Sequence, residues 1–276
     1  MAADPRTSPL SLSYYTVPEL SPPQMVRAAA AAGVAFVGAR LLNGQPGRDL
    51  APLMENSPLR RETIACLHDA GVRVLDASGA RLRPETDMTA FAPFIDVAAE
   101  LGARHILATG DDPDEPRLVA RFAELCELAG RSGLTVDLEF VPWMSIADLA
   151  LAARMVRAVA CSNFGIAVDA LHFDRSRSRV SDLAALPRTW FRYVQLCDAP
   201  GVWTSDRASL VHAAVSERLF PGEGAIDLVG LLRALPRGIP IALEIPTATL
   251  ARTAPAAERL RRAVAATRKV LVDAYG

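Results

Sequence analysis

The sequence predicts an α/β protein built as a single (β/α)8 TIM barrel over residues 1–276, and three observations support this prediction. Short apolar runs typical of strands alternate with helix-like stretches along the whole chain. No linker or change in composition interrupts this alternation. Hydrophobic residues make up 51% of the 276 residues, so one large core can form. A doubly wound open sheet is the alternative fold, but eight strand–helix units in about 250 residues suit a closed barrel better.

The order of the predicted elements follows from these apolar runs and from the residues that end them. The strands are expected over residues 11–17, 35–41, 72–77, 105–109, 135–143, 164–170, 191–197 and 239–245. Ser21 followed by two prolines predicts the start of the first helix. Later helices are expected over residues 60–70, 88–101, 116–129, 146–160 and 256–274. Gly71 and Gly102 directly follow two of these helices, which is typical of helix ends.

Composition excludes several classes of function. The net charge is −1, so no basic surface for nucleic acid is expected. The longest apolar run, residues 28–39, is too short to span a membrane. The N-terminus lacks the layout of a signal peptide, and the four cysteines form no paired motif, so we expect a cytoplasmic protein with free thiols. Lys269 is the single lysine, which argues against Schiff-base chemistry.

Polar residues lie near the ends of the last four predicted strands. They are Glu139, Asp169, Gln195 and Glu244. Successive side chains of a strand point to opposite faces, and in each case the bulky aliphatic neighbours fall on the face opposite the polar residue. In a (β/α)8 barrel the aliphatic face meets the helices, and functional groups lie at the C-terminal ends of the strands. These four side chains are therefore expected to converge at the barrel mouth.

Three carboxylates and an amide oxygen directed at one point call for a positive charge, because like charges in a low-dielectric pocket repel strongly. Oxygen ligands are hard, so the sequence predicts one divalent metal ion, Mn²⁺ or Mg²⁺ first, with Co²⁺ or Zn²⁺ as alternatives. The structural alternative is a set of carboxylate–arginine ion pairs across the mouth. Asp137, one layer deeper on the face of Glu139, is expected to support the ligands.

With these residues the chain resembles the xylose isomerase-like TIM barrels, the sugar phosphate isomerase/epimerase superfamily. Its members carry Glu, Asp, His or Gln, and Glu on strands five to eight around one divalent ion. The stretch Asp169-Ala170-Leu171-His172 resembles the family's Asp-x-x-His. The stretch from Arg218 to Gly224, reading RLFPGEG, resembles its Arg-x-x-Pro-Gly-x-Gly segment.

The resemblance implies a metal-dependent isomerase or epimerase of carbohydrate metabolism. Its substrate would be a ketose-like or keto-polyol compound, and the reaction would proceed by proton abstraction next to a carbonyl through a metal-stabilised enediolate. By this resemblance Glu139 and Glu244 are metal ligands and also the catalytic base and acid, and Asp169 and Gln195 complete the ligand set. His172 and Arg218 would contact the substrate. Because barrels of this family often pair, a homodimer is expected.

Other functions stay open at the level of sequence. Gln195 occupies a position where many sugar epimerases carry histidine, and it resembles some 3-dehydroshikimate dehydratases, so a metal-dependent lyase is the alternative. Endonuclease IV shares the barrel, but its zinc cluster uses more histidines than the four present here. A non-catalytic sugar-binding barrel is a further candidate, against which the complete ligand set argues. Trp143, after the fifth strand, is a candidate for substrate contact or for loop packing.

The small-molecule partner is expected to be a keto-sugar or a keto-acid. Scattered arginines and a single lysine form no clear phosphate-binding segment, which favours an unphosphorylated substrate. No nucleic acid and no membrane is expected as a partner.

Overall fold

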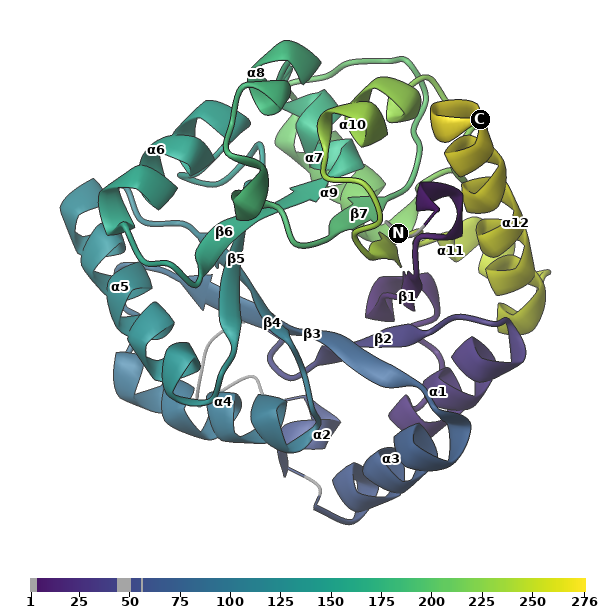
Figure 1. The fold of residues 1–276 in the computed structure, drawn as a ribbon, viewed down its shortest axis with the longest axis horizontal. Helices are drawn as coiled ribbons and strands as arrows, with labels where there is room; N and C mark the ends of the chain where they lie inside the picture. The colour runs from purple at the N-terminus through teal and green to yellow at the C-terminus, as the bar shows by residue number, and fades with distance from the viewer. Residues whose placement is uncertain (1–3, 44–50, 56) are drawn as a thin grey trace.

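A computed structural model describes residues 4–43, 51–55 and 57–276, and in this part of the chain the strands form a closed parallel barrel (Figure 1). Each strand pairs with the next in chain order, and β8 closes the ring against β1. The strands are β1 (Leu10–Leu12), β2 (Phe36–Arg40), β3 (Arg73–Leu82), β4 (His105–Gly110), β5 (Thr135–Glu139), β6 (Phe164–Asp169), β7 (Val194–Leu196) and β8 (Ile241–Leu243). The predicted fold class is thereby confirmed.

Helices surround the barrel on its outer side (Figure 1). The α-helices are α1 (Pro22–Ala31), α2 (Pro52–Glu55), α3 (Ser57–Ala70), α4 (Phe91–Glu100), α5 (Glu115–Arg131), α6 (Leu149–Val159), α7 (Ala170–Arg175), α8 (Val180–Ala184), α9 (Arg207–Ser216), α10 (Leu228–Ala234), α11 (Ala248–Ala251) and α12 (Ala256–Tyr275). Short 3-10 helices are η1 (Pro5–Thr7), η2 (Tyr14–Thr16), η3 (Met88–Ala90) and η4 (Arg188–Trp190). No helix among the described residues is both long enough and apolar enough to cross a membrane.

Several strands are shorter than the sequence predicts. Of the apolar run 11–17, only Ser11 and Leu12 lie in β1, which begins at Leu10, and the chain then turns into η2. The runs 191–197 and 239–245 contribute three residues each, Val194–Leu196 and Ile241–Leu243. β3 is longer than predicted, and its register shifts against both neighbours. Local patterns thus located every strand but not the hydrogen bonds that end it.

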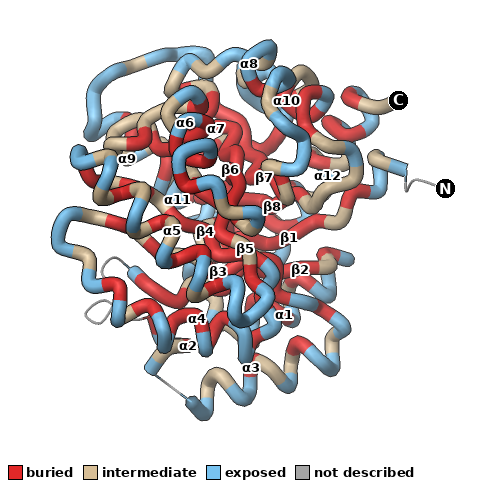
Figure 2. The backbone as a smooth tube through the Cα atoms, turned by 60° about the vertical axis from the view of Figure 1, so that its left-hand side comes forward, coloured by how far each residue is buried: buried red, intermediate tan, exposed pale blue. Residues whose placement is uncertain are grey.

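Two apolar cores confirm the predicted alternation of faces. One contains outward-facing strand residues such as Val194 and Leu243 together with helix residues. The other, smaller core fills the barrel and consists of Phe36, Leu75, Leu107, Ala167, Tyr193 and Ala242. Buried residues accordingly follow the strands in Figure 2, whereas exposed segments are concentrated in the helices and loops. Tyr193, two residues before Gln195, therefore shares the inward face with it.

Asp137, Arg192 and His105 form a polar layer inside the barrel, below the strand ends. Asp137 is fully buried and accepts a hydrogen bond from Arg192 Nη1 at 2.8 Å. His105 Nδ1 lies 3.4 Å from Asp137 Oδ2. A Cβ on Gly165 would lie 2.4 Å from the backbone oxygen of Trp190 and 2.2 Å from Arg192 Nη1, so glycine is needed where this segment passes β6. Asp137 is thus paired within this layer, and its predicted role in supporting the ligands remains a prediction.

Candidate functional site

The four polar residues predicted from the strand ends lie at the same end of the barrel, because parallel strands place their C-terminal ends together. Glu139 and Asp169 are the last residues of β5 and β6. Gln195 lies within β7 and pairs in register with Asp169. Glu244 directly follows β8.

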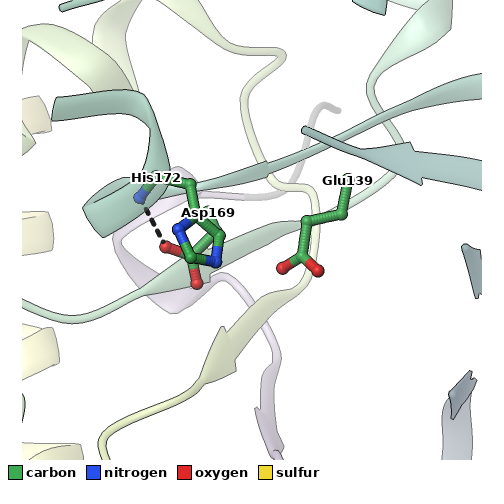
Figure 3. Close-up of side chains that lie close together, drawn as sticks. All are labelled: Glu139, Asp169 and His172. Carbon is green, nitrogen blue, oxygen red and sulfur yellow. Dashed lines mark hydrogen bonds between the residues drawn. The ribbon is translucent and has the colours of Figure 1, made fainter. Parts of the chain in front are cut away.

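Two of these carboxylates form a compact cluster with His172, on the first turn of α7. One potential ligand atom from each of Glu139, Asp169 and His172 lies within 4.8 Å of the others. Figure 3 shows the Glu139 carboxylate directed toward Asp169 and His172. Asp169 is the N-cap of α7, and its Oδ1 accepts a hydrogen bond from the His172 backbone N–H at 3.0 Å. The spacing Asp-x-x-His therefore follows from helix capping, which brings residue four of the motif next to residue one.

Asp169 is held in its charged form. Arg218 Nη1 donates to Asp169 Oδ2 at 2.6 Å, and both side chains are buried. Burial opposes the negative charge, but the Arg218 guanidinium and the hydrogen bonds outweigh it and lower the pKa of Asp169 to about 2. Asp169 is thus ionised at neutral pH even without a metal.

The pKa values of Glu139 and Glu244 are raised, in contrast to that of Asp169. Burial, followed by the charges of Glu244 and Asp169, raises the pKa of Glu139 well above its ordinary value. Burial also raises the pKa of Glu244 to about 8, with Arg218 partly offsetting the effect and Asp169 adding to it. The Glu139 and Glu244 carboxyls resist ionisation, whereas Asp169 beside them stays charged. This pattern is expected in a site that binds a cation or takes up a proton.

Gln195 bonds to Glu244 through its amide nitrogen, and its amide oxygen remains available to a ligand. Its Nε2 donates a hydrogen bond to Glu244 Oε2. Its Oε1 is buried and has no hydrogen-bond partner among the described residues. A buried amide oxygen without a partner is costly. Together with three carboxylates whose charges repel, it forms a donor set that fits a hard divalent cation.

His172 and Trp143 form the wall beside these oxygens. Burial lowers the pKa of His172 to about 4, so the ring is neutral at pH 7. Its Nδ1 is buried without a partner in the described structure. The Trp143 ring meets the imidazole edge to face, with ring centroids 5.3 Å apart. The two residues predicted to contact substrate therefore lie together, and His172 also lies within 4.8 Å of the Glu139 and Asp169 carboxylates.

Arg218 is positioned by the segment RLFPGEG, and sequence reasoning did not identify the residue that fixes this segment. Asp198 is buried and accepts four backbone hydrogen bonds, from Ala199, Gly222, Gly224 and Ile226. A side chain on Gly224 would lie 2.3 Å from Asp198 Oδ1, which explains the glycine. Because Asp198 comes two residues after the last strand residue of β7, its place at a strand end was the available signal.

The barrel and its mouth define a class of protein: a TIM barrel with a buried, oxygen-rich cluster of potential metal ligands at the C-terminal ends of β5 to β8. A family model described as xylose isomerase-like TIM barrel matches residues 26–270. The chain belongs to this family, as its sequence motifs predicted.

Two curated proteins match parts of the chain. The 3-dehydroshikimate dehydratase of Pseudomonas aeruginosa is 29% identical over 143 residues, covering 50% of this chain and 22% of that protein. The inosose isomerase of Halalkalibacterium halodurans is 30% identical over 119 residues, covering 41% of this chain and 39% of that protein. The matches therefore span well under half the length of these relatives. Both relatives are enzymes, one a dehydratase and the other an isomerase.

The fold also resembles solved structures. The IolI protein, whose structure contains a bound zinc atom, superimposes with a TM-score of 0.79 at 19% sequence identity. The superposition covers 97% of this chain and 99% of that chain. At this identity the similarity supports the fold of the whole described barrel.

Proposed function

We propose that the protein is a divalent-metal-dependent isomerase or epimerase that moves a proton next to the carbonyl of a keto-polyol. The observation that carries the proposal is the buried donor set at the ends of β5 to β8. Arg218 keeps Asp169 ionised, and Gln195 Oε1 has no hydrogen-bond partner among the described residues. Burial raises the pKa values of Glu139 and Glu244, so a bound cation would stabilise both carboxylates in the ionised form that can accept a proton from the substrate.

The side chains present would divide the work as follows. Glu139, Asp169, Gln195 and Glu244 would hold the cation, with the His172 ring beside them. A divalent cation, when bound, would polarise the substrate carbonyl and stabilise the negative charge that develops on its oxygen. Glu139 at β5 would take the proton from the carbon next to the carbonyl. Glu244, which follows β8 on another part of the ring, would deliver a proton to the substrate.

His172 and Trp143 would orient the substrate. The neutral imidazole has a buried nitrogen, Nδ1, that has no partner in the described part of the chain and can bond to a substrate hydroxyl. Trp143 offers an apolar face next to it, which suits the C–H groups of a polyol. Arg218 is bonded to Asp169, so its contribution to substrate binding would be mainly the field of its charge.

A dehydratase is the second candidate, and Gln195 is the observation that favours it. An amide in this position cannot carry a proton, and the chain shares 29% identity over 143 residues with a 3-dehydroshikimate dehydratase. In that reaction the same proton abstraction is followed by loss of a β-hydroxyl, which leaves as water after it receives a proton. Glu244 would supply that proton instead of returning one to carbon.

Reactions in heavy water distinguish these functions. The purified protein would be stripped with a chelator, reloaded separately with Mn²⁺, Mg²⁺, Co²⁺ or Zn²⁺, and incubated with an inosose, a ketohexose and 3-dehydroshikimate. Deuterium uptake at the carbon next to the carbonyl, without loss of water, supports the isomerase. A new aromatic absorbance from 3-dehydroshikimate, or a new conjugated-enone absorbance from a saturated keto-polyol, supports the dehydratase. If no substrate exchanges with any metal and no divalent ion is retained, both candidates are wrong and a binding barrel is favoured.

A further inference from the structure

Glu244 lies one residue beyond β8, and the sheet holds its backbone on the β7 side. Among the described residues this hold is one long hydrogen bond, from the Glu244 N–H to Leu196 O at 3.3 Å. Its carboxylate accepts a hydrogen bond from Gln195 Nε2 and lies 3.8 Å from Arg218 Nη1. Some other contact must hold the backbone at this residue.

Thr16, at the end of η2, provides that contact. Its hydroxyl donates to Leu243 O at 2.7 Å and accepts from the Ile245 N–H at 2.9 Å. A single side chain thereby bonds to the residue before Glu244 and to the residue after it. Thr16 is 1% exposed, so water does not compete for these bonds.

Thr16 is in turn held from the other side. Arg259 of α12 donates from Nη1 to Thr16 O at 2.8 Å. The Arg259 side chain is itself buried and ion-paired with Glu19. The Ser13 N–H also bonds to Leu243 O, at 3.0 Å. Thr16 therefore joins the last helix to the backbone around Glu244 through fixed hydrogen bonds.

We propose that Thr16 is a positioning residue that sets the place of the Glu244 carboxylate. This inference rests on the proposed function of Glu244 as metal ligand and proton donor. A catalytic group displaced by about 1 Å loses on the order of 100-fold in rate. Removing the hydroxyl leaves the Ile245 N–H unsatisfied in a buried place, so the backbone shifts to find another partner.

The test compares three variants. Thr16→Val keeps the shape of the side chain and removes the hydroxyl, whereas Thr16→Ser keeps the hydroxyl. Thr63→Val is the matched control, because Thr63 is also buried and its hydroxyl donates one hydrogen bond, to Leu59 O at 2.8 Å on α3. Co²⁺ alone serves as the probe, with its affinity measured by calorimetry and its geometry by visible absorption. Where the wild type turns over a substrate, kcat and KM are also measured.

For Thr16→Val we expect Co²⁺ affinity to fall about tenfold with a changed absorption band, and kcat to fall about 10- to 100-fold with little change in KM. Thr16→Ser should restore both to within about twofold, and Thr63→Val should change neither. Wild-type behaviour of a folded Thr16→Val variant would overturn the inference, as would equal losses in Thr63→Val.

Two further measurements keep the outcomes separate. If Thr16→Val does not fold, Thr16→Cys replaces it. Because a thiol is a weaker hydrogen-bond donor and acceptor than a hydroxyl, Co²⁺ affinity and kcat should fall in Thr16→Cys, but less than is expected for Thr16→Val. Wild-type values for Thr16→Cys would contradict the inference. If the wild type binds no divalent ion, the proposed function fails on its own. The crystal structure of the variant then decides about Thr16: a shifted Glu244 carboxylate supports the positioning role, and an unchanged one refutes it.

Discussion

Arg218 and Asp169 form a buried ion pair with 2.6 Å between Arg218 Nη1 and Asp169 Oδ2, directly behind the candidate metal site. The two residues are 49 positions apart and both are almost completely inaccessible to solvent. The guanidinium thereby provides the positive charge that the carboxylates need before any cation binds. The carboxylate–arginine pairing that the sequence offered as the structural alternative is therefore present: Arg218 bonds to Oδ2 of Asp169, while the His172 backbone bonds to Oδ1.

Replacing Arg218 should destabilise the metal-free protein. Arg218→Met leaves two buried carboxylates without their partner, which costs about 3–5 kcal/mol of unfolding free energy. Mn²⁺ should recover part of this loss, since the cation supplies the missing charge. Urea unfolding with and without Mn²⁺ measures both effects. Arg179→Met, which breaks an exposed pair with Asp182, should cause no measurable change. An equal loss with and without metal would show that Arg218 does not act on the carboxylates.

The two glutamates should be needed for chemistry more than for substrate binding. Glu139→Gln and Glu244→Gln keep an oxygen at each position but cannot accept a proton, so kcat should fall about 10²- to 10⁴-fold while KM changes little. Steady-state kinetics on the substrate identified by deuterium uptake provide the measurement. Glu124→Gln, on the exposed side of α5, is the control. Full activity of either site variant would exclude that glutamate as base or acid.

The donor set can be separated residue by residue with Co²⁺. Gln195→Leu should weaken Co²⁺ binding about tenfold, because the variant removes one oxygen ligand. His172→Leu should change the affinity much less if His172 faces the substrate, and exposed His212→Gln should change nothing. Loss of the Co²⁺ band in His172→Leu instead would identify the cluster of Glu139, Asp169 and His172 as the metal-binding group.

Asp76, inside the barrel, should make stability depend on pH. Burial raises its pKa to about 7, with His105 opposing and Asp137 adding to the effect. Between its unfolded pKa and about 7 the native state therefore binds more protons than the unfolded state, so this contribution to stability is present at low pH and is lost as pH rises.

Asp76→Asn should consequently be more stable than the wild type at pH 8.5, by at most about 4 kcal/mol, and should differ little at pH 4. Urea unfolding at both pH values tests this, with exposed Asp96→Asn as the control. The same difference at both pH values would mean that Asp76 does not titrate in the native barrel.

The direction of the side chains at the strand ends could be predicted from the sequence. Glu139 and Asp169 were predicted to face the mouth because alternation along a strand is a local pattern, and two apolar cores confirm that alternation. The Asp-x-x-His spacing was equally local, since it is set by helix capping. The length of β8 was not predictable, because a strand ends where its neighbour stops offering hydrogen bonds.

The sequence by itself determined the order of the strands, the inward faces and the identity of the four polar residues. Each of these depends on residues within a few positions of one another. Only the tertiary structure decided which side chains hold the four polar residues in place. Arg218 reaches Asp169 from 49 residues away, and Thr16 reaches the backbone at Glu244 from the other end of the chain. Such partners leave no local pattern, because closing the barrel is what brings β1 next to β8.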